Sequence, residues 1–202
     1  IVDDAVESNP ADQYGGDFWG LYLALEQPDG RFLDAHGLPD ANFYKMEGGF
    51  GDPNNLGPQG PTDSSDLLAF LTAYGGNNYQ SLTETWWRTN MNLPAYYSYQ
   101  TIVQAIHHYD IGDGKNYYFY RDPRDNRWMT IPWDLDLTWA DNMYRGGQFG
   151  DSPNGGGEPF KLRVLSDFHA NPQFPAIQRE FKNRVREIRD LLWNSDQTGQ
   201  LI

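Results

Sequence analysis

The sequence predicts an α+β protein in which a few strands and one central β-hairpin are combined mainly with helices. Two segments near the start are rich in aromatic and branched residues and end at turn signals. In the middle of the chain, a polar "PRDN" separates two further aromatic segments. Residues 97–109 and 174–193 repeat apolar side chains at helical spacing.

The first predicted strand is "DFWGLYLALEQ", residues 17–27, which alternates and stops at the turn signal "PDG". A second short strand is expected in "NFYKMEGGF", residues 42–50. Gly, Pro and Asn dominate "GDPNNLGPQGPTD", residues 51–63, so we expect a loop there.

Polar residues mark the starts of two helices. Asp63 or Ser64 is suited to cap the first helix. "SLTE", residues 81–84, has the spacing of a capping box before "TWWRTN". The apolar face of the first helix is expected at Leu67, Leu68 and Leu71.

The helix predicted over 97–109 should end just before Asp110. Its apolar repeat consists of Tyr99, Ile102, Val103, Ile106 and Tyr109. "NYYFYRD" and "RWMTIPWD" then predict a hairpin over about 117–133. The glycine-rich segment 140–160 is expected to be a loop, and the segment 174–193 an amphipathic packing helix. The apolar face of that helix is Ile177, Phe181, Val185, Ile188 and Leu192.

Composition excludes several classes of function. The chain has 202 residues with 39% hydrophobic content, enough for one sizeable core. A formal net charge of −13 argues against a nucleic-acid backbone or an anionic membrane as the main partner. The absence of cysteine excludes disulfides, thiol chemistry and cysteine zinc sites. No apolar run of about 18 residues is present, so we expect no membrane span.

Acids and amides are concentrated at the two ends of the predicted hairpin. Asp110, Asp113 and Asn116 precede it, and Asp134 and Asp136 follow it. Because a hairpin brings its ends together, these side chains should be neighbours, and their like charges need a metal or a proton between them. Carboxylate and amide oxygens without His or Cys favour Mg²⁺, Mn²⁺ or Ca²⁺ over zinc.

The polar loop, the two histidines and the hairpin aromatics each have a simpler interpretation. The polar residues of "DIGDGKN", residues 110–116, are also typical of Asx turns. His107 and His108 lie at a helix end and are expected to be capping or core residues rather than ligands. The hairpin aromatics are expected to be core residues rather than a platform for a nucleotide base. The pairing of polar ends with an apolar hairpin is the feature that these interpretations do not explain.

Protein kinases place similar polar residues before and after a short hairpin. A catalytic loop supplies an Asp near the substrate hydroxyl and an Asn to the metal, and a second Asp after a short hairpin holds Mg²⁺. Here "HYD" precedes "IGDGKN", and "WDLD" follows the hairpin. Five residues separate Asp110 from Asn116, one more than in the kinase signature.

Four quoted segments together resemble the CotH kinase family, named for a spore coat protein. They are "GLYLALEQPDGRFL", "NFYK", "KNYYFYRDPRDNRW" and "IPWDLDLTW", and the resemblance extends over roughly residues 18–192. The family implies an atypical protein-kinase-like fold, mainly its helical C-terminal lobe with hinge strands. It also implies phosphate transfer from ATP to Ser or Thr of secreted or coat proteins of bacteria, with Mg²⁺ as the metal.

The resemblance also implies roles for individual residues. Asp110 matches the catalytic Asp, and Asp134 matches the metal-binding Asp of "WDLD". Asn116 and Asp136 are expected to contribute to the metal site. The segment around Glu26 is similar to a kinase hinge, where the adenine edge would bind.

We expect residues 1–202 to form a single domain portion whose N-terminal lobe is largely absent, because the phosphate-covering loop and ATP-binding Lys should lie upstream. The chain would then be a fragment or a processed form, and an enzyme only if that part is supplied. An extracellular, cell-surface or spore-surface location is expected. Two alternatives remain: a non-catalytic kinase-like surface or structural module with a Ca²⁺ or Mg²⁺ site, and a glycosidase with paired carboxylates.

Overall fold

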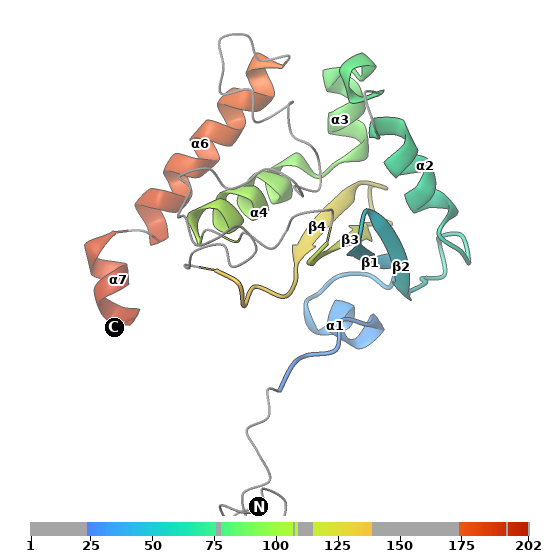
Figure 1. Ribbon diagram of the computed structural model, residues 1–202, viewed down its shortest axis with the longest axis horizontal. Helices are drawn as coiled ribbons and strands as arrows, with labels where there is room; N and C mark the ends of the chain where they lie inside the picture. The colour runs from blue at the N-terminus through green and yellow to red at the C-terminus, as the bar shows by residue number, and fades with distance from the viewer. Residues whose placement is uncertain are drawn as a thin grey trace, which may run out of the picture.

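The computed structural model describes residues 24–75, 78–106, 108, 115–138, 174–192 and 194–201. These residues form a four-stranded antiparallel sheet with helices on both faces, which confirms the α+β class (Figure 1). The strands are β1 (Phe43–Glu47), β2 (Phe50–Asn55), β3 (Tyr117–Arg121) and β4 (Trp128–Pro132). The helices are α1 (Gly30–Ala35), α2 (Ser65–Tyr74), the 3-10 turn η1 (Asn78–Ser81), α3 (Glu84–Asn90), α4 (Leu93–Ala105), α6 (Pro175–Leu192) and α7 (Ser195–Leu201).

Strand β2 was not expected from composition. The strand order is β2-β1-β3-β4, and β2 pairs with β1 through a turn at Gly48 and Gly49, whose φ angles are 60° and 82°. Glycine adopts such angles without a steric penalty, which favours a tight hairpin turn. The loop prediction for 51–63 is therefore wrong over 51–55. Pro53 is tolerated there because β2 is an edge strand.

The central hairpin is confirmed. Strands β3 and β4 pair from Tyr117 opposite Pro132 to Arg121 opposite Trp128. The turn is closed by the backbone N–H of Asn126, which donates to the carbonyl of Asp122 over 2.7 Å.

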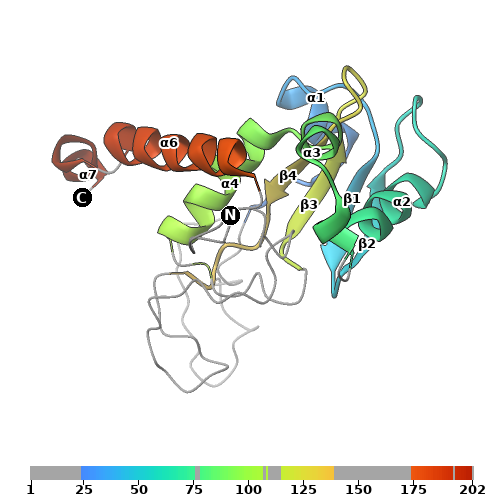
Figure 2. The same ribbon diagram turned by 90° about the horizontal axis from the view of Figure 1, so that it is seen from above.

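Both faces of the sheet are buried. On β3, Tyr117 and Phe119 belong to a large cluster with α2, α3, α4 and α6, whereas Tyr118 and Tyr120 belong to a smaller cluster with α1. The two-residue period of a strand produces this alternation. The views in Figures 1 and 2 show α1 on the opposite side of the sheet from α2 and α4.

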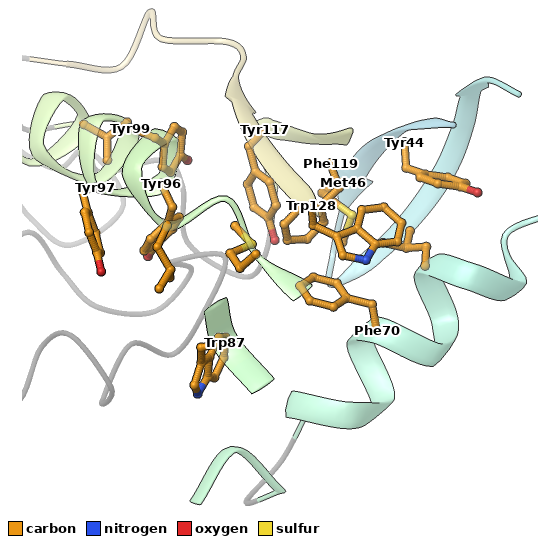
Figure 3. Close-up of a cluster of buried hydrophobic side chains, with 14 of the residues drawn as sticks. Tyr44, Met46, Phe70, Trp87, Tyr96, Tyr97, Tyr99, Tyr117, Phe119 and Trp128 are labelled. Atoms are coloured by element: carbon orange, nitrogen blue, oxygen red, sulfur yellow. The ribbon is translucent and has the colours of Figure 1, made fainter. Parts of the chain in front are cut away.

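Phe70 of α2 is the aromatic centre of the large cluster (Figure 3). Its ring centroid lies 5.1 Å from that of Trp128, 5.5 Å from that of Phe119 and 5.9 Å from that of Trp86. These stacked and edge-on contacts join α2 and α3 to the central hairpin.

Two details of the predicted helices are wrong. Ser64 is the N-cap residue of α2 but makes no side-chain capping hydrogen bond, and Asp63 accepts from the Ser65 N–H over 2.9 Å. Leu68 is 63% exposed, and Phe70 is buried in its place. Helix α3 is capped by Thr83, whose Oγ1 accepts from the Trp86 N–H over 3.1 Å, and not by Ser81. Ser81 is instead the last residue of η1.

Helix α4 is longer than predicted at its start. The Asn92 side chain accepts from the Ala95 N–H over 3.2 Å, and Pro94 is tolerated in the first turn. The helix ends at Ala105, so the prediction that it continues to residue 109 is wrong at Ile106, and Asp110 lies outside the described residues. Helix α6 is confirmed with Ile177, Phe181 and Ile188 buried, whereas Val185 and Leu192 are exposed.

Two predicted elements lie wholly or partly outside the described residues. Residues 140–160 are outside them, and so are residues 17–23 of the expected first strand. The described part of that segment, 24–27, is not a strand, so the strand prediction is wrong there. Among the helices of the described ranges, none is long and apolar enough to cross a membrane.

Glu180 ties α6 to α3 and α4. Its carboxylate accepts from the Arg88 guanidinium over 2.8 and 3.1 Å and from the Tyr97 hydroxyl over 3.1 Å. The Arg88 hydrogen bonds are the main reason that the pKa of Glu180 is held below its ordinary value of 4.5. The ionised form therefore stabilises the fold above pH 4.5, and this contribution is lost as the pH falls below it.

Replacing Glu180 by Gln is expected to reduce the loss in free energy of unfolding that occurs as the pH falls. Urea unfolding at about pH 6 and about pH 3 should show a smaller loss of stability in the variant than in the wild type, because the variant has no carboxylate to protonate. Glu47→Gln, at an exposed position at the end of β1, is the matched control and should retain the wild-type profile. Identical profiles for Glu180→Gln and the wild type would contradict this assignment.

Candidate functional site

The open end of the central hairpin brings together residues from both sides of the predicted site. Just beyond the last strand pair, the Trp133 N–H donates to the Asn116 carbonyl over 3.2 Å. Asp134 follows directly, so it lies one residue from the partner of Asn116. The Asn116 side chain is 5% exposed, whereas Asp134 and Asp136 are exposed. Two of the predicted donor positions, 116 and 134, therefore meet at the same end of the sheet.

Asn116 and Asp134 share an unusual backbone conformation. Their φ angles are 63° and 54°, in the left-handed region that few non-glycine residues other than Asn and Asp adopt, and Asn126 in the hairpin turn has a φ angle of 59°. Such residues persist only where the surrounding structure holds them, and they are enriched at ligand sites. Here the paired strands hold them, one at each side of the hairpin base.

His108 connects the end of α4 to the chain that leaves β4. Its ring is 2% exposed, and its Nδ1 lies within hydrogen-bond distance of the Leu137 carbonyl at 3.3 Å. The segment after β4 runs back toward the C-terminal end of α4 in both views (Figures 1 and 2). His108 is thus a core residue, as expected. His107, Asp110 and Asp113 lie outside the described residues.

A family model described as CotH kinase protein matches residues 11–200. The chain belongs to the CotH kinase family. Membership extends over nearly the whole sequence and indicates an atypical kinase-like class of function. No curated protein matches the sequence.

In this CotH chain, the donor atoms at the hairpin base suit a hard cation. Asn116 carries an amide oxygen, and Asp134 and Asp136 carry carboxylates, and their convergence on one ion stays a prediction. Oxygen-only ligands fit Mg²⁺, Mn²⁺ or Ca²⁺. Within the described ranges, no group of three or more His, Cys, Asp or Glu side chains gathers at one point. A complete site therefore requires the amide of Asn116, a carboxylate from outside those ranges, or the phosphates of a nucleotide.

Glu26 lies elsewhere and has its own partner. Its carboxylate is exposed and 3.0 Å from His36 Nε2, a residue that follows α1. Residues 24–28 form no strand, so the hinge-like strand that suggested an adenine contact is not present in this part of the segment. A role for Glu26 in nucleotide binding stays a prediction.

A buried polar network that the sequence did not indicate lies at the other end of the hairpin. Tyr44 donates to the Asp66 carboxylate over 2.6 Å, and Arg121 donates to it over 3.3 Å. Asn42 accepts from the Gly57 N–H over 2.9 Å. Burial and the Asp66 carboxylate raise the pKa of the Tyr44 hydroxyl, which therefore stays protonated.

A cavity of about 90 Å³ lies beside this network. It is lined by Ala41, Asn42, Gln59, Gly60, Asp66, Arg121, Pro123 and Asn126.

This network holds the fold and is separate from the candidate site. Arg121 ends β3, whereas Asn116 directly precedes its first residue. The network partners are far apart in the chain, as Asn42 and Asp66 are, and no local motif links them. Their association therefore depends on how α2 and the chain that precedes it pack against the sheet.

Proposed function

We propose that this CotH family chain carries the catalytic and metal-binding part of an atypical protein kinase that transfers phosphate from ATP to Ser or Thr of a protein. The observation that supports this most directly is the hairpin base. There the Trp133–Asn116 hydrogen bond of 3.2 Å joins the segment that precedes β3 to the segment that follows β4. Kinase chemistry needs this juxtaposition, because catalysis of phosphoryl transfer is mainly positioning and charge stabilisation. The acceptors are proposed to be secreted, cell-surface or spore-coat proteins.

Asp110 is proposed to orient the acceptor hydroxyl and to take its proton late in the transfer. In the sequence it follows His108 by two residues, and His108 holds the carbonyl of Leu137 beside the end of α4. His108 and the segment that carries Asp134 are therefore joined through one buried side chain.

Asn116, Asp134 and Asp136 are proposed to hold Mg²⁺ or Mn²⁺. The bound ion would neutralise the phosphate charge that develops during transfer. The left-handed backbone at Asn116 and Asp134 occurs at both sides of the hairpin base, next to the proposed ligands.

The alternative is a non-catalytic kinase-like module that binds Ca²⁺ or Mg²⁺ at the same hairpin base. The donor set is equally compatible with it. The two functions differ in one observable, since only a kinase consumes ATP in the presence of an acceptor.

Asp134→Asn tests the proposal. The neutral amide is expected to weaken Mg²⁺ affinity by roughly tenfold or more, which is typical of the loss of a charged ligand. Phosphate transfer from labelled ATP should fall at low Mg²⁺ and recover in part at high Mg²⁺, because the defect is one of metal occupancy. Affinity is measured by calorimetry, and transfer is measured in the natural full-length protein with a Ser-rich peptide.

Asp52→Asn, at an exposed position on β2, is the matched control and should change neither quantity. Equal Mg²⁺ affinity in wild type and Asp134→Asn would remove Asp134 from the ligand set. Normal metal binding in a wild-type protein that transfers no phosphate would favour the non-catalytic module.

A further inference from the structure

The cations of this acidic chain are concentrated on one helix. The chain has 15 Lys and Arg residues and a net charge of −13, yet α6 carries five cations in 18 residues. They are Arg179, Lys182, Arg184, Arg186 and Arg189. Residues 24–66, by contrast, contain eight acids and two Lys or Arg. The charge is therefore separated between two regions of the chain.

Three of these cations form a stripe along α6. Arg179, Lys182 and Arg186 are spaced three and four residues apart, which places them on one side of a helix. Arg179 and Arg186 are exposed, and Lys182 is partly buried. The buried side of α6, with Ile177, Phe181 and Ile188, is turned toward the core. We call Arg179, Lys182 and Arg186 the basic stripe.

The acids of α6 are engaged elsewhere. Glu180 is bound by Arg88, and Glu187 lies 2.7 Å from Arg184. Asp190 pairs with its neighbour Arg189.

No salt bridge joins the stripe to an acid in the part of the chain that the structure describes, although, besides the Arg88 hydrogen bonds, the charge of Arg179 contributes to lowering the pKa of Glu180. Arg186 donates to the side-chain oxygen of Asn183, a neutral group. No ion pair joins Arg179 or Lys182 to an acid among the described residues. Among the described residues, the guanidinium and ammonium groups of the stripe are thus not held in salt bridges.

We propose that the basic stripe docks peptide segments that carry phosphoserine, the product class of the proposed kinase reaction. The identity of the ligand rests on that proposed function. A guanidinium presents a planar fork of donors that matches phosphate oxygens, and clusters of Arg are a common means of recognising phosphopeptides. Phosphoserine carries more negative charge than Asp or Glu and offers three acceptor oxygens, so the same cations bind it more tightly.

A short peptide fits this surface better than a membrane or a nucleic acid does. The net charge of −13 repels large polyanions, whereas a short segment meets only the local field of the stripe. The buried apolar residues of α6 are packed on the core, where the ring centroids of Tyr97 and Phe181 lie 6.0 Å apart, and are not available to lipid. The apolar residues of α6 that stay exposed, Val185, Leu191 and Leu192, lie toward its C-terminal end.

The size and position of the stripe suit a substrate that is phosphorylated more than once. From Arg179 to Arg186 the helix rises about 10 Å, which equals about three residues of extended peptide. Helix α6 lies beside α4, and both end on the same side of the molecule, where α4 leads to His108 (Figures 1 and 2). A phosphorylated segment held on α6 would keep the next serine of the same chain close to the hairpin base.

The test is a titration without ATP, so it does not depend on catalysis. The probes are one Ser-rich peptide with two phosphoserines three residues apart and the same peptide unphosphorylated. The phosphorylated peptide should bind about tenfold tighter or more, and Arg179→Glu/Arg186→Glu should remove about that preference. Arg31→Glu/Lys45→Glu makes the same change in net charge away from α6 and should have an effect of less than about threefold.

Thermal unfolding verifies that both double variants are folded. Equal affinity for the two peptides would overturn the proposal, and so would equal losses in the stripe variant and the control. Tighter binding to phosphatidylserine vesicles than to the phosphopeptide would also overturn it in favour of a membrane surface. Phosphopeptide binding that depends on the stripe, in a protein that transfers no phosphate, would support the docking site and reject the kinase function.

Discussion

Asp110→Asn in the natural full-length protein is expected to lower the rate of phosphate transfer by about 10²- to 10⁴-fold, the usual contribution of a positioned general base. The amide keeps the shape of the side chain but cannot accept the proton of the acceptor hydroxyl. The fold and Mg²⁺ affinity should be nearly unchanged, because this residue is proposed to act on the hydroxyl and not on the metal.

Transfer of labelled phosphate onto a Ser-rich peptide measures this effect across a range of Mg²⁺ concentrations. The loss in Asp110→Asn should persist at high Mg²⁺, whereas that in Asp134→Asn should be partly restored. Asp52→Asn, at an exposed position on β2, is the matched control and should retain most activity. Full activity of Asp110→Asn would show that another group accepts the proton.

Phe70→Ala is expected to destabilise the fold by about 3–5 kcal/mol, the range for deleting a large buried aromatic side chain. The Phe70 ring is buried and contacts Trp86, Phe119 and Trp128, so its removal leaves a cavity between α2, α3 and the central hairpin (Figure 3). The same hairpin forms the candidate site at its base, so the variant should also reduce metal binding when it is partly unfolded.

Leu68→Ala on the same helix is the control for this prediction. Leu68 is 63% exposed, and its truncation should change stability by about 0.5 kcal/mol or less. Urea unfolding followed by tryptophan fluorescence measures both variants. A loss in Leu68→Ala as large as that in Phe70→Ala would mean that α2 buries a different face from the one described.

The two ends of the central hairpin differ in their contacts and backbone. The turn end is fixed by the network of Asn42, Tyr44, Asp66 and Arg121, which attaches α2 to the sheet. The open end holds Asn116 and Asp134 in left-handed backbone. Left-handed backbone is not confined to the open end, because Asn126 in the turn has a φ angle of 59°.

The sequence by itself was enough to determine the α+β class, the hairpin, helix α6 and the CotH family. These features depend on local periodicity, on turn residues such as "PRDN" and on motif spacing, all of which are encoded within short segments. It also predicted that Asn116 and Asp134 would meet, because a hairpin necessarily brings its two ends together.

Only the tertiary structure decided which residues are buried and which polar groups pair over long distances. Leu68 and Phe70 are both apolar residues of α2, and the choice of Phe70 for the core depends on how α2 packs on Trp128. Strand β2 forms from a sequence that resembles a loop because β1 supplies backbone hydrogen-bond partners. The association of Asn42 with Asp66, and of Arg88 with Glu180, joins segments that no local pattern relates. Contacts of this kind are a property of the folded chain, since they form only when separate elements pack together.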